Sequence, residues 1–252
     1  MPTYEELRGK VVVVTGASRG IGREIALGFA RAGADLVLAS RKAPSLEPVA
    51  AEVRALGVRA EVVPTHVGKA DEARRLIETT MERFSRIDVL VNNAATNPVF
   101  GPTVTADEAV WDKIFEVNVR GPFVLSRAAS EKMIAQGGGA IVNVASVAGL
   151  RPMMGLGIYG VSKAALIHLT RTLARELAPS IRVNAVAPGL VETSFSRALL
   201  DDPDVRKLAL ADVPLARPAA PAEIVDGVLF LACDASRYVT GEVLVIDGGK
   251  IV

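Results

Sequence analysis

Residues 11–22 read VVVVTGASRGIG. The four valines predict a buried strand, and the segment from Ile21 onward has the apolar spacing of a helix. Between them, Gly16 permits a tight turn, Gly20 leaves room for a phosphate beside the backbone, and Gly22 lets the helix lie close to the sheet. The amino terminus of the helix would then present free N–H groups to a pyrophosphate. A glycine-rich connection without function is the competing interpretation, but the strand before it, the helix after it and a second strand ending about 20 residues further on favour a dinucleotide site. We expect this loop to contact the dinucleotide through Gly16, Ser18, Arg19, Gly20, Ile21 and Gly22.

The rest of the chain alternates short β-branched runs with longer segments rich in Ala, Leu, Arg and Glu. The predicted strands are 11–14, 35–39, 60–63, 89–91, 140–144, 181–187 and 243–246. The predicted helices are 21–32, 44–56, 70–84, 106–135, 159–177 and 221–233. This alternation predicts an α/β protein with a parallel sheet covered on both faces. We expect a single-domain doubly wound Rossmann fold over residues 1–252, with a seven-stranded parallel sheet.

Composition excludes several classes of function. The 252 residues carry 29 Lys plus Arg against 28 Asp plus Glu, for a formal net charge of +1, and 50% of them are hydrophobic. This balance indicates no basic surface for nucleic acid, and no run approaches the roughly 18 uninterrupted apolar residues of a membrane span. Glu5 and Glu6 stand where a signal peptide would carry positive charge, and Cys233 is the sole cysteine. We expect a soluble, cytoplasmic protein with no metal, nucleic-acid or membrane partner.

The end of the second strand bears on which dinucleotide binds. An acidic residue there would accept a hydrogen bond from the ribose 2′-hydroxyl and repel a 2′-phosphate. The chain instead carries Ser40, Arg41 and Lys42, and Arg19 in the glycine loop can approach from the other side. A guanidinium offers a planar fork to phosphate, so the sequence predicts NADP(H) as cofactor in preference to NAD. The competing interpretation is a solvated turn.

Tyr159 and Lys163 are four residues apart, and Ser146 follows a predicted strand. The spacing puts the first two on one helix face, and the strand end puts Ser146 at the ligand-binding edge of the sheet. A lysine ammonium and a cationic nicotinamide would stabilise the phenolate, because the usual pKa of about 10 makes a phenol a poor base at neutral pH. Tyr159 would exchange a proton with a carbonyl or alcohol oxygen, and Ser146 would hydrogen-bond the same oxygen. An exposed amphipathic pair and a turn-forming serine are the competing interpretation.

These motifs together resemble the short-chain dehydrogenase/reductase family over essentially the whole chain. The loop 15–22 is similar to the family's cofactor motif, and the segment 92–95 (NNAA) resembles its Asn-Asn-Ala-Gly segment, with Ala95 in place of the glycine. The resemblance implies a catalytic tetrad of Asn118, Ser146, Tyr159 and Lys163, in which Asn118 holds a water that links Lys163 to solvent. It also implies cofactor contacts from Asn93, Ala94, Pro188, Gly189, Val191 and Thr193.

A narrower resemblance is to the NADPH-dependent carbonyl and retinal reductases of the dehydrogenase/reductase member 4 type. Its residues are 40–42 (SRK), 66–69 (HVGK), 93–98 (NAATNP), 187–190 (APGL) and 193–197 (TSFSR). His66 stands where many family members carry an aspartate that contacts adenine. We therefore expect that contact to fall to the backbone of Val67.

The residues expected over the nicotinamide are mostly apolar: Thr96, Asn97, Pro98, Val147, Met153, Met154, Leu156, Leu190 and Phe195. Two adjacent methionines suggest an adaptable wall that suits bulky apolar ketones and aldehydes. The segment after Gly189, through Asp204, is expected to form a mobile lid. The predicted helix 159–177 is apolar on several sides, which predicts self-association, and the family resemblance implies a homotetramer.

The first hypothesis is an NADP(H)-dependent carbonyl reductase or alcohol dehydrogenase acting on small molecules. A 3-oxoacyl thioester reductase, acting on acyl-carrier-protein substrates, fits the general family pattern as well. A non-catalytic dinucleotide sensor is the third hypothesis, and it would not need all four tetrad residues.

Overall fold

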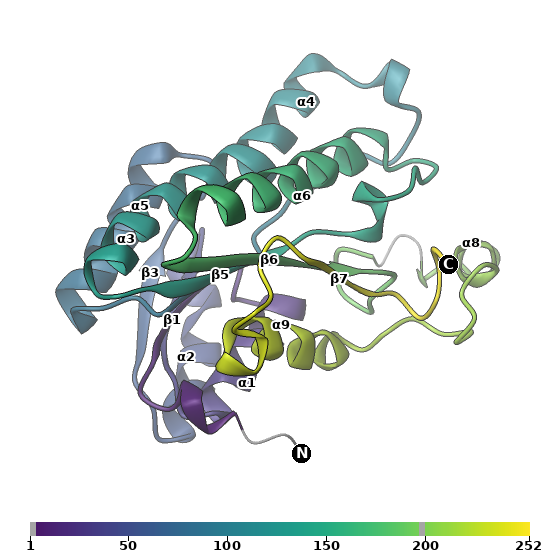
Figure 1. The fold of residues 1–252 in the computed structure, drawn as a ribbon. Coiled ribbons are helices and arrows are strands. Elements are labelled where there is room, and N and C mark those ends of the chain that lie inside the picture. Colours follow the sequence, from purple (N-terminus) through teal and green to yellow (C-terminus); the bar gives the residue numbers. More distant parts are fainter. Residues whose placement is uncertain (1–3, 197–199) are drawn as a thin grey trace.

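The computed structural model describes residues 4–196 and 200–252, and strands alternate with helices along the chain (Figure 1). The strands are β1 (Val11–Thr15), β2 (Asp35–Ser40), β3 (Ala60–Pro64), β4 (Val89–Asn92), β5 (Gly139–Val144), β6 (Ile181–Pro188) and β7 (Val243–Ile246). The α-helices are α1 (Gly20–Arg31), α2 (Glu47–Ala55), α3 (Ala70–Phe84), α4 (Glu108–Phe115), α5 (Gly121–Ala135), α6 (Gly157–Leu177), α8 (Pro203–Leu210) and α9 (Val225–Ala232). Short 3-10 turns occupy Glu5–Leu7, Ala43–Ser45, Thr103–Thr105, Val147–Gly149, Pro221–Ile224 and Asp234–Ser236.

The seven strands form one parallel sheet in the order β3-β2-β1-β4-β5-β6-β7. The predicted doubly wound α/β fold is therefore confirmed, and every predicted strand end lies within one residue of the observed one. The order reverses at β1, which pairs with β2 on one side and β4 on the other. In sheets of this kind, ligands bind outside the carboxyl ends of the strands at such a reversal.

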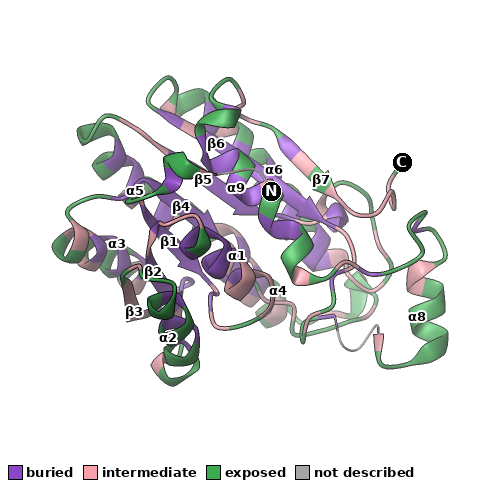
Figure 2. Ribbon diagram, turned by 90° about the horizontal axis from the view of Figure 1, so that it is seen from below, coloured by how far each residue is buried: buried purple, intermediate pink, exposed green. Residues whose placement is uncertain are grey.

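Both faces of the sheet are covered by helices (Figure 1). On β1, Val12 and Val14 pack into the core cluster that contains residues of α1, α2 and α9. Val11 and Val13 pack into the opposite cluster, with residues of α3, α5 and α6. Alternate side chains of a strand point to opposite faces, so a strand buried on both sides has an unbroken apolar sequence. Figure 2 shows the central strands of the sheet as buried.

The predicted helix 106–135 is not continuous. The chain forms α4, then a π-helical turn over Glu116–Arg120, and then α5. Pro122 has no N–H to donate to the carbonyl of Asn118, which interrupts the α-helical ladder at this point. Helix α4 begins after Asp107, whose carboxylate caps it by accepting a hydrogen bond from the N–H of Ala109 at 2.7 Å.

Helix α8 begins with the last two residues of the predicted lid, Pro203 and Asp204, and was not predicted as a helix. Asp202 caps it by accepting hydrogen bonds from the N–H groups of Asp204 (2.9 Å) and Val205 (3.1 Å). Nearly all of α8 is exposed (Figure 2). Residues 197–199 of the predicted lid, and with them Arg197 of the narrower resemblance, lie outside the described residues. Within the described ranges, no helix has both the length and the apolar character to cross a membrane.

Candidate active site

Loops from the carboxyl ends of β1, β4 and β6 meet at one edge of the sheet. A Cβ added to Gly16 would lie 2.8 Å from Nδ2 of Asn93, which follows β4. A Cβ added to Gly20 would lie 3.3 Å from Cγ2 of Thr193, in the segment after β6. A Cβ on Gly22 would overlap both the carbonyl oxygen of Gly16 and the Asn93 amide. Gly16 and Gly20 also have φ values of +67° and +57°, so this loop requires glycine for its backbone conformation as well as for its packing.

Thr15 joins the glycine loop to the end of β4. Its Oγ1 accepts hydrogen bonds from the N–H groups of Asn93 (3.0 Å) and Ala94 (3.1 Å), and it donates to the carbonyl of Val91 (3.2 Å). Asn93 Nδ2 in turn donates to the carbonyl of Thr15 at 2.8 Å. Four hydrogen bonds thus fix the two loops to each other, and the turn does not depend on a glycine at Ala95.

The start of α1 suits a phosphate. The residue before the helix, Arg19, gives no side-chain cap, so the first N–H groups of α1 lack a side-chain partner. The Arg19 side chain is exposed beside them, and Ser18 is half-buried. Unsatisfied N–H groups at the positive end of a helix dipole bind anions well. The close glycine packing and these free groups together fit a pyrophosphate at this terminus.

Arg41 and Lys42 are exposed just beyond the end of β2. Across the part of the chain that the structure describes, neither side chain forms an ion pair. Ser45 stabilises this turn by donating a hydrogen bond to the carbonyl of Lys42 at 2.7 Å, and its Oγ lies 3.4 Å from that of Ser40. The end of β2 therefore offers two cationic side chains to an anionic ligand.

His66 is held in place by its neighbours. Its Nε2 lies 3.0 Å from Nζ of Lys113, and it accepts a hydrogen bond there because an ammonium group can only donate. The backbone N–H of His66 donates to Oε2 of Glu72 at 2.7 Å, and this hydrogen bond lowers the pKa of the Glu72 carboxyl. The adjacent Val67 is buried. Nε2 of His66 is thus engaged by Lys113, whereas the buried Nδ1 has no hydrogen-bond partner among the described residues.

Ser146, Tyr159 and Lys163 come together where β5 meets α6. Ser146 caps the 3-10 turn after β5 by accepting a hydrogen bond from the N–H of Ala148 at 3.2 Å, and its hydroxyl is near enough to that of Tyr159 to act on the pKa of the phenol. Nζ of Lys163 donates to the carbonyl of Val144 at 2.7 Å and lies 5.6 Å from the centre of the Tyr159 ring. All three groups therefore face one site at the carboxyl end of β5.

Burial dominates the titration of this pair. It raises the pKa of Tyr159 to about 12, although the nearby Ser146 hydroxyl acts in the opposite direction. It lowers the pKa of Lys163 to about 7, because an ammonium group loses its hydration in the apolar interior. In the cofactor-free protein Tyr159 is thus a protonated phenol. The stabilised phenolate expected from the sequence requires a further positive charge in the site.

Asn118 is completely buried in the π-helical turn. Its Oδ1 accepts from the N–H of Thr96 at 2.8 Å, and its Nδ2 donates to the Thr96 carbonyl and to Oγ of Ser162, both at 3.0 Å. Ser162 donates to the carbonyl of Tyr159 at 2.7 Å. Sequence reasoning missed Ser162, although its signal was a hydroxyl residue between Tyr159 and Lys163. A π-helical turn is common at functional sites, and here it carries the side chain that connects the loop after β4 to α6.

The segment after β6 is folded back on itself. The N–H of Gly189 donates to the carbonyl of Ile246 at 2.9 Å, and Val191 is bridged to Ala219. Oγ1 of Thr193 accepts from the N–H of Phe195 at 3.2 Å. The Phe195 ring lies 5.5 Å from that of Tyr159, centre to centre, with 46° between their planes. This segment, which starts at the end of β6 (Pro188), brings an aromatic side chain against Tyr159.

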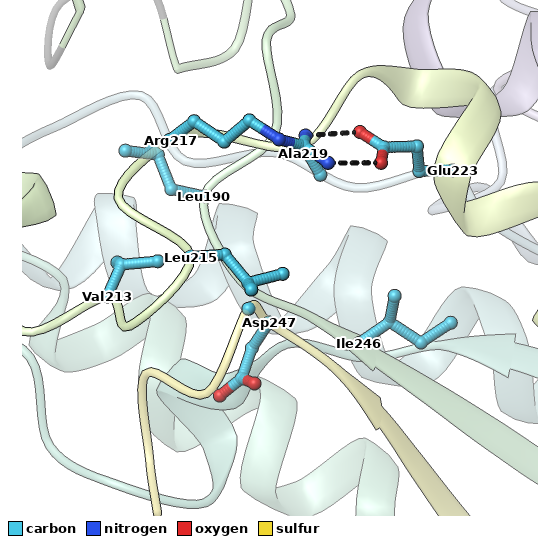
Figure 3. Close-up of a pocket in the computed structure, with 9 residues that line it drawn as sticks. Leu190, Val213, Leu215, Arg217, Ala219, Glu223, Ile246 and Asp247 are labelled. Atoms are coloured by element: carbon cyan, nitrogen blue, oxygen red, sulfur yellow. Dashed lines mark hydrogen bonds and ion pairs between the residues drawn. The ribbon is translucent and has the colours of Figure 1, made fainter.

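The residues expected to form an apolar wall do not all lie at the same place in the structure. Val147 and Met153 pack into a small apolar cluster beside the site. Met154 is 95% exposed, so the pair of methionines does not act as one wall. Leu190 lines a separate cavity of about 150 Å³ with Val213, Leu215 and Ile246 (Figure 3). Neither Ser146 nor Tyr159 lines that cavity, whose rim carries a two-bond ion pair between Arg217 and Glu223 at 2.7 Å.

Comparisons with known proteins agree with this fold. A family model described as enoyl-(acyl carrier protein) reductase matches residues 16–250. Dehydrogenase/reductase SDR family member 4 of Oryctolagus cuniculus is 42% identical over 246 residues, which are 97% of this chain and 95% of that protein. The NADPH-dependent 3-quinuclidinone reductase from Rhodotorula rubra has a TM-score of 0.92 at 30% identity, covering 99% of this chain and 95% of the other. An NAD+-bound xylitol dehydrogenase has a TM-score of 0.93 at 34% identity, covering 97% and 100%.

The chain belongs to the short-chain dehydrogenase/reductase family of oxidoreductases. Within it, the chain is similar to dehydrogenase/reductase member 4, so both resemblances stated from the sequence motifs are confirmed.

Proposed function

We propose that this protein is an NADP(H)-dependent carbonyl reductase or alcohol dehydrogenase that acts on small apolar ketones and aldehydes. The observation that carries the proposal is the Tyr159 side chain, which lies near Ser146 and beside the buried Lys163 at the sheet edge where the glycine loop also lies. A dinucleotide sensor would have no use for this arrangement. The whole of residues 1–252 would serve as one dinucleotide-binding and catalytic unit.

Tyr159 would act as the proton donor in the direction of reduction. Its pKa of about 12 keeps the phenol protonated at neutral pH, as an acid must be before the reaction. Its proton would pass to the carbonyl oxygen of the substrate, which Ser146 would hold in line by a second hydrogen bond. A bound nicotinamide would supply the hydride in this direction and accept it in the other.

Lys163 would restore the proton on Tyr159. Its pKa of about 7 lets it hold or release a proton near neutral pH, and its place one turn along α6 keeps the ammonium near the ring. As a cation it would stabilise the phenolate that remains after proton transfer. Asn118 would anchor the water that links Lys163 to solvent, as the family resemblance implies.

The dinucleotide would lie along the carboxyl edge of the sheet. The first turn of α1 and the loop glycines fit its pyrophosphate, and the buried backbone at Val67 suits the adenine. Asn93, Ala94 and the segment containing Pro188, Gly189, Val191 and Thr193 would hold the nicotinamide half. One similar structure is an NADPH-dependent reductase and another is a dehydrogenase bound to NAD+. Both similarities support a nicotinamide dinucleotide as the cofactor of this protein.

NADP(H) is preferred because of the cations at the end of β2. Arg41 and Lys42 are exposed and form no ion pair with any residue in 4–196 or 200–252, so they suit a 2′-phosphate, with Arg19 on the other side. Replacement of Arg41 by Ala should weaken binding of NADPH much more than that of NADH. Equal affinity of the unmodified protein for the two cofactors would overturn this preference.

The proposed substrate class follows from the surroundings of Tyr159. The Phe195 ring contacts Tyr159, and the apolar cluster with Val147 and Met153 lies beside it. Such walls favour apolar carbonyl compounds, and Ser146 and Tyr159 would offer polar groups to the reacting oxygen.

NADPH oxidation with a set of carbonyl compounds tests the proposal. The set contains an aromatic diketone, retinal, an acetoacetyl thioester and a keto sugar, and NADH serves as the second cofactor. Turnover of the apolar carbonyls should disappear in Tyr159→Phe and persist in Tyr238→Phe, because Tyr238 is fully exposed. Faster turnover of the thioester would favour an acyl thioester reductase, and cofactor binding without any turnover would favour a sensor.

We further propose assembly into a homotetramer. Trp111, Phe123 and Val161 leave 41%, 42% and 46% of their surface exposed on α4, α5 and α6, where a second copy can cover them. Sedimentation of the protein as a monomer would contradict this assembly.

A further inference from the structure

We propose that Arg120 is a positioning residue for the adenine half of the dinucleotide. It holds the loop 66–68 against the π-helical turn that carries Asn118. This inference rests on the proposed function, because it assigns adenine to that loop.

Arg120 bonds directly to the loop. Its Nη2 donates a hydrogen bond to the carbonyl of the buried Gly68 at 2.7 Å. The same guanidinium lies 3.5 Å from Oε1 of Glu116, one turn earlier. Glu116 also packs on the loop, because a Cβ added to Gly68 would lie 2.6 Å from its Oε1. The ion pair thus aims the guanidinium at the loop carbonyl.

Two more contacts join the same helical segment to the same loop. A Cβ added to Gly121 would lie 2.8 Å from the carbonyl oxygen of Val67, so the two backbones touch. Lys113 reaches the ring of His66 at 3.0 Å and lies 3.6 Å from Glu116. Successive turns of the segment from α4 to α5 therefore contact all three loop residues.

The other side of the π-helical turn faces the reacting centre. Asn118 is two residues from Arg120, and residues so spaced on a helix point in different directions. Asn118 bonds Thr96 and Ser162, whereas Arg120 bonds Gly68. One rigid turn thus connects the adenine loop with the residue proposed to hold the catalytic water.

Removal of the guanidinium would leave the Gly68 carbonyl without its donor. The loop would then shift to find water, and the backbone at Val67 would move with it. The Arg120 side chain is 58% exposed, so the fold itself would survive the change. The binding affinity should decrease for ligands that contain adenosine, while the rate of the reaction at Tyr159 should not change.

Fragment binding separates this role from a general structural one. The experiment compares the unmodified protein, Arg120→Met, Arg120→Lys and the control Arg127→Met. Arg127 is an exposed residue of α5 whose side chain makes no hydrogen bond or ion pair within the described ranges. Calorimetry measures binding of NADPH, of adenosine 2′,5′-bisphosphate as the adenine half, and of reduced nicotinamide mononucleotide as the other half. Steady-state rates give kcat and the KM for NADPH.

We expect Arg120→Met to weaken NADPH and adenosine 2′,5′-bisphosphate by about five-fold each, the effect of losing one charge-assisted hydrogen bond. The nicotinamide fragment and kcat should stay within about two-fold of the unmodified values. Arg120→Lys should recover part of the affinity, because a lysine can still donate to the carbonyl, and Arg127→Met should change nothing.

Unchanged affinity of Arg120→Met for the adenine fragment would overturn the inference while leaving the proposed function intact. Equal weakening of both fragments would also overturn it, since it would indicate a general loss of structure. If Arg120→Met does not fold, the same comparison applies to Arg120→Lys, which must then show the adenine-specific loss. Failure of the unmodified protein to bind any of the three ligands would remove the proposed function, and the inference with it.

Discussion

Replacement of Lys163 by Met should stabilise the cofactor-free protein while abolishing its activity. Lys163 is 2% exposed, and its Nζ has the Val144 carbonyl as hydrogen-bond acceptor. Burial lowers its pKa from 10.5 to about 7. Each tenfold loss of proton affinity corresponds to about 1.4 kcal/mol, so this residue costs the folded state about 4 kcal/mol at pH 7. Loss of the hydrogen bond to Val144 offsets about 1 kcal/mol of that, which leaves a net gain of about 3 kcal/mol.

The gain should depend on pH in a defined direction. Between pH 7 and pH 10.5 the unfolded chain binds a proton at Lys163 that the folded protein has released. The stability of the unmodified protein therefore rises with pH over this interval, and the advantage of Lys163→Met disappears near pH 10.5.

Urea unfolding followed by circular dichroism, at fixed protein concentration, measures both effects. Lys132→Met serves as the control, since Lys132 is exposed on α5 and should show no gain. The reasoning is refuted if Lys163→Met is less stable than the unmodified protein at pH 7, or if the two proteins have the same pH dependence.

Three more predictions follow from the same structure. Burial raises the pKa of Tyr159 from 10.0 to about 12, so the stability it contributes is present below pH 10 and lost as the pH rises to about 12. In that interval the unmodified protein should lose about 2 kcal/mol more than Tyr159→Phe in urea unfolding. Gly22→Ala should reduce NADPH affinity at least about ten-fold in a fluorescence titration, because its Cβ would overlap the carbonyl of the first loop glycine. Gly101→Ala meets no atom within 4 Å and should bind normally. Arg182→Met should lower the free energy of unfolding by about 2–4 kcal/mol, because the guanidinium donates to three carbonyls at the end of α9, whereas the exposed Arg175→Met should not.

The centre of the sheet could be predicted from the sequence because β1, β2, β4 and β5 are almost entirely buried, whereas the edge strands β3 and β7 are only partly so. In such strands every position is apolar, and the pattern needs no knowledge of partners. The glycine loop could also be predicted from the sequence. Gly16 and Gly20 have positive φ angles, and Gly22 has no room for a Cβ, so each position favours glycine.

Features that depend on contacts far along the chain were not predictable. The break at Asn118 is an exception, because its signal, Pro122, is local and was overlooked within the apolar spacing of 106–135. The exposure of Met154 depends on the path of the loop before α6, and the spacing of apolar residues in the sequence does not predict that path. The pKa of Tyr159 is likewise set by the surrounding core, which the sequence separates into distant segments.

The π-helical turn over Glu116–Arg120 has a consequence for insertions and deletions. Such a turn is an α-helix that has accommodated one additional residue. Deletion of Val119 would remove the additional residue and shift the Asn118 side chain away from Thr96 and Ser162, the two residues that it bonds. Random deletion libraries should therefore lack viable chains with a gap at 116–120, whereas gaps at the exposed positions 99 and 100 should be tolerated. The number of residues in this segment is therefore constrained, and a scan of single substitutions would not detect that constraint.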